Sequence, residues 1–123
     1  DEKSCEVRVK LSWFNQNPFR SMYFAVEAMA AEMSCGMLAF GQVYKRQPAV
    51  SMLVEKLEAK FVKKATGVII FTCEDGEALR DTVNEALQNP EGTKLQVTSI
   101  GRNQAGEIVA EFYLTWTFKA KNL

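Results

Sequence analysis

Two glutamates stand in an otherwise apolar stretch of the sequence. The stretch from Arg20 to Phe40 carries apolar residues on every side of a helical wheel and includes Glu27 and Glu32. A helix that is apolar all round is usually buried. A carboxylate on such a helix is costly unless it is paired, and in a partly desolvated cleft its raised pKa suits a general base. Glu27 and Glu32 are therefore the first candidates for catalytic carboxylates.

Other common chemistries are excluded by the residues that the chain lacks. The sequence has no histidine, which excludes Ser-His-Asp and Cys-His mechanisms. Its three cysteines, Cys5, Cys35 and Cys73, are widely spaced and form no CxxC pair, so no zinc or other metal site is expected. An odd number of scattered cysteines also indicates reduced thiols, and we expect a cytoplasmic protein in which Cys35 is a packing residue.

Composition and length restrict the possible partners. The 15 basic and 15 acidic residues balance, so nothing indicates nucleic-acid binding. The 123 residues suit a single domain over 1–123. The apolar stretch is nearly long enough to cross a bilayer, but an acidic residue at mid-bilayer costs about 2.5 to 3.5 kcal/mol. We expect a helix packed in a protein core and no membrane span.

The elements that position the glutamates follow from the change of hydrophobic period along the chain. Alternation predicts strands, apolar spacing by three and four predicts helices, and the loops carry Gly, Asn or Pro. Expected strands are 5–13, 50–62, 68–73, 94–100 and 107–119; expected helices are 20–40 and a short one that begins after Asp75; 41–48 is expected as a linker. In the long helix, Ala25, Ala28, Ala31 and Cys35 form a small face that should lie against the sheet. The order predicts an α+β protein with a curved antiparallel sheet wrapped around a long central helix, plus one short helix, which is the hotdog fold.

Several segments resemble hotdog-fold acyl-CoA thioesterases. The segment Asn17–Gly36 is similar to their helix motif, and closest to the uncharacterised thioesterase-like group of DUF4442 type. The segments 59–67 and 105–119 resemble the strand and turn, and the last strand, of the same proteins. The matching positions of the helix motif are Asn17, Ser21, Tyr23, Phe24, Glu32 and Gly36.

The resemblance implies hydrolysis of an acyl-CoA or similar thioester at a site between subunits of a homodimer or homotetramer. Glu32 stands at the position of the family's acid, with Asn17 as a second catalytic residue, and no cofactor is needed beyond the coenzyme A of the substrate. Glu27 matches no acidic position and points about 140° around the helix from Glu32. The implied substrate-binding residues are Arg20, Ser21, Tyr23, Phe24, Gly36, Lys63 and Lys64.

Several alternatives stay open at this stage. Glu27 is more simply explained as a solvated or paired interface charge, for example with Arg20, and Glu32 is equally explained as a structural charge. Arg20 replaces a Gly of the relatives, so it either crowds the oxyanion position or binds phosphate. The residues Lys45, Arg46, Lys63 and Lys64 are either phosphate ligands or ordinary surface charges. The methionine stripe of the helix, Met22, Met29, Met33 and Met37, is either an acyl pocket or core. The alternative function is a non-catalytic acyl- or lipid-binding hotdog module.

Overall fold

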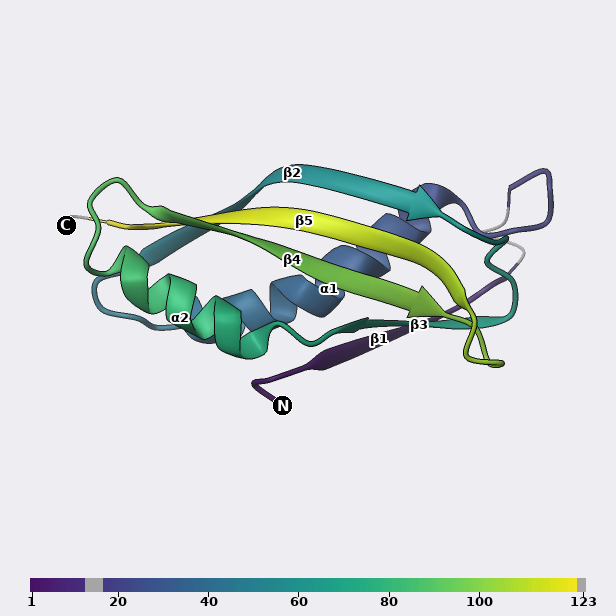
Figure 1. Cartoon of the computed structure of the whole chain (residues 1–123), viewed down its shortest axis with the longest axis horizontal. Helices are drawn as coiled ribbons and strands as arrows, with labels where there is room; N and C mark the ends of the chain where they lie inside the picture. The colour runs from purple at the N-terminus through teal and green to yellow at the C-terminus, as the bar shows by residue number, and fades with distance from the viewer. Residues whose placement is uncertain (13–16, 122–123) are drawn as a thin grey trace.

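Five antiparallel strands form one sheet, and a long helix lies on one of its faces (Figure 1). The structure is a computed structural model that describes residues 1–12 and 17–121. Across the sheet the strand order is β1-β3-β4-β5-β2, so β1 and β2 are the two edges. The elements are β1 (Cys5–Lys10), α1 (Phe24–Val43), β2 (Val50–Phe61), β3 (Val68–Cys73), α2 (Gly76–Ala86), β4 (Thr93–Arg102) and β5 (Ile108–Ala120).

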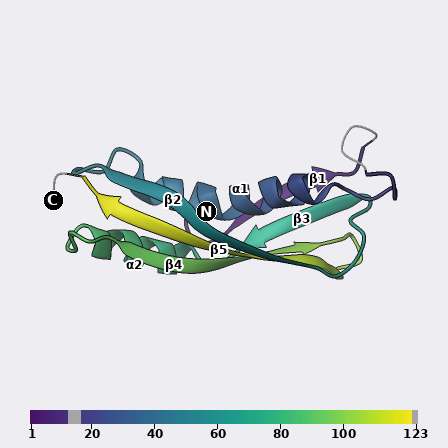
Figure 2. The same ribbon diagram turned by 90° about the horizontal axis from the view of Figure 1, so that it is seen from above.

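The sheet is curved, and α1 runs along its length while α2 packs beside α1 at one end (Figures 1 and 2). β5 is the longest strand and lies next to the β2 edge, paired with β4 on one side and β2 on the other. Its alternating residues are fully or nearly buried, because one face of the strand meets α1 and α2. This confirms the predicted α+β class, the antiparallel sheet and the two helices.

Helix α1 begins later than the sequence predicts, at Phe24 rather than Arg20. Arg20 has a left-handed backbone conformation with φ 62°, which a right-handed helix cannot contain. The Met22 N–H then donates to the Ala65 carbonyl at 2.9 Å, so this part of the chain bonds to the β2–β3 connection instead of to a helical turn. At the other end α1 continues to Val43, which takes in the first residues of the expected linker.

The structure shows which apolar face of α1 is buried, and it is not the methionine stripe that could have been core. The buried side of α1 consists mainly of small residues, and the buried α1 residues are Glu27, Ala30, Ala31, Ser34, Cys35, Leu38 and Ala39. Of the predicted small face, Ala31 and Cys35 are buried, whereas Ala28 is half-buried and Ala25 is exposed. The stripe of larger residues is exposed, with Met29 at 67%, Met33 at 54% and Met37 at 57%. Small side chains let the helix backbone approach the sheet closely, which leaves the large ones on the outer side. Of this stripe, only Met22 lies in the core of the single chain.

A hydroxyl pair and an indole contact lie within the apolar core beneath α1. Phe71 and Phe112 pack edge to face, with ring centroids 5.8 Å apart. The Ser34 and Ser99 hydroxyls, both fully buried, hydrogen-bond at 2.7 Å and join α1 to β4. The Trp116 indole N–H donates to the Cys35 Sγ at 3.3 Å. Cys35 is thus a packing residue as expected, and burial raises its pKa to about 11.

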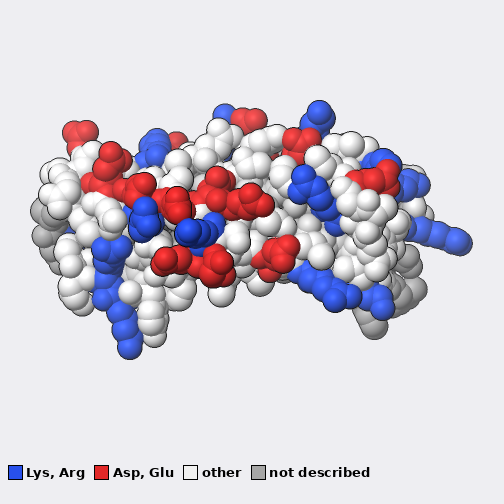
Figure 3. Space-filling model, turned by 60° about the horizontal axis from the view of Figure 1, so that its bottom comes forward, with Lys and Arg blue, Asp and Glu red and all other residues white. Residues whose placement is uncertain are grey.

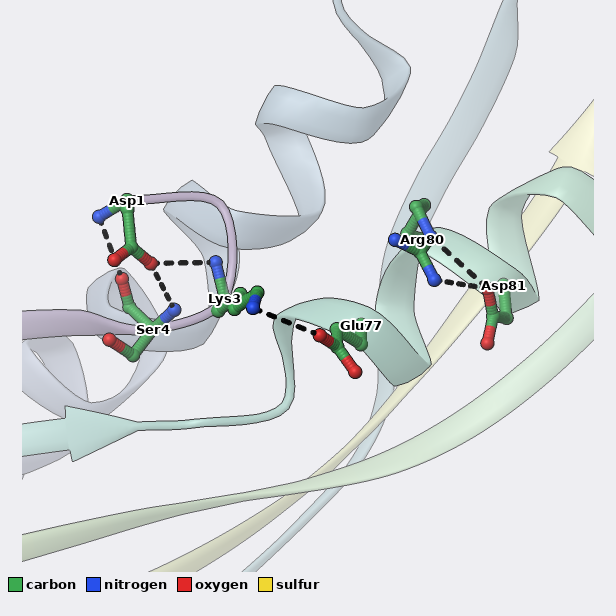
Figure 4. A network of polar contacts seen from close by, with 6 residues as sticks. All are labelled: Asp1, Lys3, Ser4, Glu77, Arg80 and Asp81. Carbon is green, nitrogen blue, oxygen red and sulfur yellow. Dashed lines mark hydrogen bonds and ion pairs between the residues drawn. The ribbon is translucent and has the colours of Figure 1, made fainter.

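The chain before β1 is held against the start of α2 (Figure 4). The Gly76 N–H donates to the Lys3 carbonyl at 3.0 Å, and the Lys3 ammonium lies 3.6 Å from the Glu77 carboxylate. A Cβ on Gly76 would come within 2.0 Å of the Glu2 carbonyl oxygen, so only glycine permits this approach. The expected strand end at Trp13 and the first turn residues, Asn15 and Gln16, lie outside the described residues.

Helix α1 is long and apolar enough to cross a membrane by length and composition. In the structure it lies against the sheet and contacts every one of the five strands.

Candidate functional site

The Glu27 carboxyl is buried at the N-terminal end of α1. Glu27 is only 4% exposed, and its Oε1 atom has no hydrogen-bond partner among the described residues. The ion pairs found between residues 1–12 and 17–121 do not include Glu27, so within one chain Glu27 is neither a solvated charge nor the partner of Arg20. Burial raises the pKa of Glu27 to about 7. A carboxyl in this state is divided between its neutral and charged forms near neutral pH.

A cavity of about 330 Å³ opens beside this carboxyl, between the start of α1 and the connection from β2 to β3. We call it the Glu27 pocket. It is lined by Asn17, Ser21, Met22, Phe24, Glu27, Phe61, Val62, Lys63, Lys64 and Ala65. The Phe24 and Phe61 rings are edge to face with centroids 6.4 Å apart, and Phe61 in turn meets Phe112 of the core at 5.6 Å.

The turn before α1 is built around the Asn17 side chain. Its Oδ1 accepts from the Phe19 N–H at 2.9 Å and from the Ser21 N–H at 3.2 Å, and its Nδ2 donates to the Ser21 hydroxyl at 3.1 Å. The Arg20 N–H donates to the Asn17 carbonyl at 3.0 Å. These bonds hold Arg20 in the left-handed conformation that favours glycine, which agrees with the glycine of the resembled family at this point.

The two lysines that line the Glu27 pocket interact with other residues and not with the Glu27 carboxyl. Lys63 forms an ion pair with Glu107, and Lys64 donates to the Phe19 carbonyl at 3.4 Å. Both lysines are exposed, so their ammonium groups lie toward solvent while the carboxyl of Glu27 is enclosed. The pocket therefore has a buried acid at its base and basic groups at its rim.

Glu32 lies in different surroundings. It is exposed and borders a second cavity of about 450 Å³ on the outer side of α1. We call this the Glu32 groove; it is lined by Met29, Glu32, Met33, Gly36, Met37, Met52 and Trp116. Gly36 lies directly above the Trp116 ring, with a Cβ position 3.4 Å from it, so β5 contributes the indole to the floor of the groove.

The structure divides the predicted site residues into two groups. Asn17, Ser21, Phe24, Lys63 and Lys64 share the Glu27 pocket, whereas Glu32 and Gly36 share the Glu32 groove. Tyr23 and Arg20 are exposed and line neither of these two cavities. The assignment of catalytic and binding roles to these residues stays a prediction.

Two of the expected phosphate ligands lie at the other end of α1. The Lys45 ammonium is 5.4 Å from the centroid of the Tyr44 ring, and the Arg46 Nε–H donates to the Gln42 carbonyl at 3.0 Å. They follow the last turn of α1, whereas Lys63 and Lys64 lie beside its first turn. One phosphate group cannot contact all four residues in a single chain.

The surface charges are mixed in sign. On the face shown in Figure 3 a band of acidic side chains is flanked by Lys and Arg, and no extended basic surface is seen there.

Sequence reasoning did not place Glu27 in a pocket with Asn17. The signal was present, because Glu27, Ala31, Ser34 and Leu38 are spaced by four, three and four residues. This is one helical stripe, and it is the small-residue stripe that packs on the sheet. Once the small face is assigned as the inner one, Glu27 must be an inner residue.

Comparison with known proteins assigns the fold and gives a family match. The family model described as "Domain of unknown function (DUF4442)" matches residues 1–118. No curated protein matches the chain. A Pseudomonas aeruginosa protein of unknown function, described as a "Probable Thioesterase", has a similar structure with a TM-score of 0.78 at 20% identity, over 96% of this chain and 77% of its own.

Two other solved structures carry more specific descriptions. A Bacillus halodurans protein was solved with CoA; its TM-score is 0.69 at 15% identity, over 92% of this chain and 66% of its own. A Staphylococcus aureus thioesterase has a TM-score of 0.72 at 10% identity, over 97% of this chain and 88% of its own. It was solved as two variants, in which a glutamine and a glutamate 15 positions apart were each replaced by alanine. These likenesses confirm the predicted hotdog fold.

Proposed function

This chain belongs to the DUF4442 family, and from that premise we propose that it is an acyl-CoA thioesterase in which Glu32 is the catalytic carboxylate. The observation that carries the proposal is the Glu32 groove. An exposed carboxylate stands there in a cavity whose other walls are three methionines of α1, Met52 and the Trp116 ring. A polar reacting group beside flexible apolar walls suits a polar thioester that is flanked by apolar groups.

A second copy of the chain is needed to complete this site. Asn17 and Glu32 do not line a common cavity in one chain. Both edges of the Glu32 groove are exposed apolar surface, and β2 has no strand on its outer side in the described part of the chain. A free edge strand with exposed apolar residues, here Leu53 and Leu57, is a natural place for another strand to pair. We propose that two copies associate through β2 and the outer side of α1, as a homodimer that can form a tetramer.

The dimer would bring Asn17 of one copy to Glu32 of the other. Asn17 and Glu32 are 15 positions apart, the same separation as the glutamine and glutamate replaced in the Staphylococcus aureus thioesterase. Asparagine and glutamine carry the same amide group. The Asn17 Nδ2 uses one N–H for the Ser21 hydroxyl, which leaves its second N–H for the oxygen of a thioester carbonyl.

The reaction then needs no cofactor. Glu32 takes a proton from a water molecule as the water oxygen attacks the thioester carbonyl carbon. The negative charge that develops on the carbonyl oxygen is stabilised by the Asn17 amide and by backbone N–H groups near the start of α1. The C–S bond breaks, the carboxylic acid is formed, and the CoA sulfur leaves as a thiolate that takes up a proton. The neighbour solved with CoA supports coenzyme A as the thiol part of the substrate.

Thiol release from a panel of acyl-CoAs of different chain length tests this proposal. Wild type should release CoA, and both Glu32→Gln and Asn17→Ala should lower kcat/KM by roughly 100-fold or more, since each removes a group that acts on the reacting atoms. Glu85→Gln, on exposed surface of α2, is the matched control and should be as active as wild type. No release by wild type from any member of the panel would refute the enzyme. Acyl-CoA binding without release would instead establish a non-catalytic acyl-binding module.

A further inference from the structure

Glu27 has a buried oxygen to which no other described residue donates a hydrogen bond, although the side chain borders a cavity. Oε1 of Glu27 is fully buried without a partner, and the residue is 96% enclosed by its own chain. An unpartnered buried polar atom is unfavourable by about 1 to 3 kcal/mol, so such atoms are rare in folded proteins. In pockets, a group of this kind commonly finds its partner in the ligand.

The remaining walls of the Glu27 pocket describe that ligand. Phe24, Phe61 and Val62 give apolar walls, and Lys63 and Lys64 stand at the exposed rim. The lysines disfavour a cationic ligand, although a cation would otherwise be the obvious partner for a carboxylate. An anionic group at the inner end is disfavoured by the Glu27 carboxylate itself. The inner end of the ligand must therefore be neutral and able to hydrogen-bond.

We propose that the Glu27 pocket is a subsite for an acyl group that carries a hydroxyl, which hydrogen-bonds the Glu27 carboxyl. The proposal rests on the proposed function, because Asn17 is both a wall of this pocket and the residue assigned to the thioester carbonyl. A thioester held at Asn17 has the Glu27 pocket directly beside it. Glu27 is then a specificity residue and takes no part in breaking the C–S bond.

A hydroxyl suits both protonation states of Glu27. It donates to the carboxylate, and it accepts from the neutral carboxylic acid. A plain alkyl chain in the same pocket would exclude water and leave Oε1 without any partner. A site with a buried polar group rejects a ligand that lacks the matching group much more strongly than an apolar pocket rejects an extra methylene. The pocket should therefore prefer a hydroxylated acyl group to the plain one.

Binding of non-hydrolysable thioethers tests the subsite without reference to catalysis. The probes are S-decyl-CoA and a series of S-(hydroxydecyl)-CoA compounds in which the hydroxyl is moved along the chain. For wild type, at least one hydroxylated compound should bind roughly tenfold more tightly than S-decyl-CoA. Glu27→Leu should abolish the preference, and Glu27→Gln, whose amide still hydrogen-bonds, should keep part of it. The control Glu85→Leu should keep all of it.

Two results would overturn the subsite. One is equal binding of all thioethers to wild type. The other is a loss of affinity in Glu27→Leu that is the same for plain and hydroxylated compounds, since that would mean Glu27 binds an amide of the pantetheine arm, which all of them share. If wild type prefers the hydroxylated thioethers but releases no thiol from the corresponding thioesters, the proposed hydrolase activity is refuted and the proposed subsite is supported.

A probe without CoA covers the case in which no thioether binds. The carboxyl ¹³C resonance of Glu27 is followed by NMR while wild type is titrated with 1-hexanol or with n-hexane. The resonance should shift with 1-hexanol and to a much smaller extent with n-hexane. The same response to both compounds, or to neither, would refute the subsite even if the proposed enzyme activity had already failed.

Discussion

Replacing Glu27 by glutamine should stabilise the protein relative to wild type, and this stabilisation should be larger at pH 8 than at pH 5. Burial raises the pKa of Glu27 from 4.5 to about 7. The folded state therefore binds the proton of this carboxyl more tightly than the unfolded state does. The stability that this proton contributes is fully present below pH 4.5 and is lost as the pH rises to about 7. Glutamine has the same shape and no charge at any pH, so it removes this loss.

The size of the effect follows from the shift. Each unit of pKa corresponds to about 1.4 kcal/mol, so the shift corresponds to roughly 3 kcal/mol when Glu27 is fully ionised. Most of this, about 2 to 3 kcal/mol, is lost between pH 5 and pH 8. The free energy of unfolding of Glu27→Gln minus that of wild type should therefore rise by about 2 to 3 kcal/mol over this range. That is a large part of the 5 to 15 kcal/mol by which domains are usually stable.

Urea unfolding of both proteins at several pH values between 5 and 8 measures this difference. Titrations of the other carboxyl groups occur in both proteins and cancel. Glu85→Gln is the control, and its difference from wild type should change much less, because that side chain lies on the exposed surface of α2. A Glu27→Gln difference that is flat from pH 5 to pH 8 would show that Oε1 is hydrated or paired in solution, and the account of the pocket would fail.

Four further changes test the packing of the chain and its association. Gly101→Ala places a Cβ 2.6 Å from the Phe71 ring and should lower the free energy of unfolding, measured with urea, by about 1 to 3 kcal/mol. Gly41 lies in α1 with nothing within 4 Å of its Cβ position, so Gly41→Ala should raise the same free energy by up to about 1 kcal/mol. Arg20→Gly relieves the strain of a left-handed backbone conformation and should raise the free energy of unfolding by about 0.5 to 1 kcal/mol. A decrease in the same assay would mean that the Arg20 side chain stabilises the turn. Met33→Lys should convert the proposed dimer to monomer in sedimentation velocity without lowering monomer stability, and an unchanged sedimentation coefficient would place the subunit interface elsewhere.

The fold could be predicted because its strands and helices have clear periods. The alternation of β5 and the β-branched run of β3 each determine an element by themselves. The start of α1 could not be predicted in the same way. The apolar pattern extends back to Phe19, but the hydrogen bonds of Asn17 and the bond from Met22 to Ala65 take those residues out of the helix. Ala65 is more than 40 positions away in the sequence, and a local pattern contains no information about it.

The large and the small face of α1 raise the same problem. A helical wheel shows that both faces are apolar but does not show which one meets the sheet. Packing decides it in favour of the small face, because close approach buries more backbone and β-sheet surface than large side chains would permit. The methionine stripe then remains exposed in a single chain, where an interface or a ligand has to cover it if the protein is to avoid a large apolar patch.

Because the sequence does not show which face of α1 meets the sheet, the surroundings of the two glutamates could not be predicted either. The angle of about 140° between Glu27 and Glu32 was correct and sufficed to exclude a carboxylate pair. The same angle means that if one glutamate faces the sheet, the other faces outward. The family pattern assigns chemistry to the outward one, where a second subunit can supply Asn17. The inward one keeps an unpartnered oxygen in a pocket of the same chain. An exposed base completed by a partner and a buried acid that selects the ligand are compatible roles, and the pH dependence of Glu27→Gln and the thiol release of Glu32→Gln test them separately.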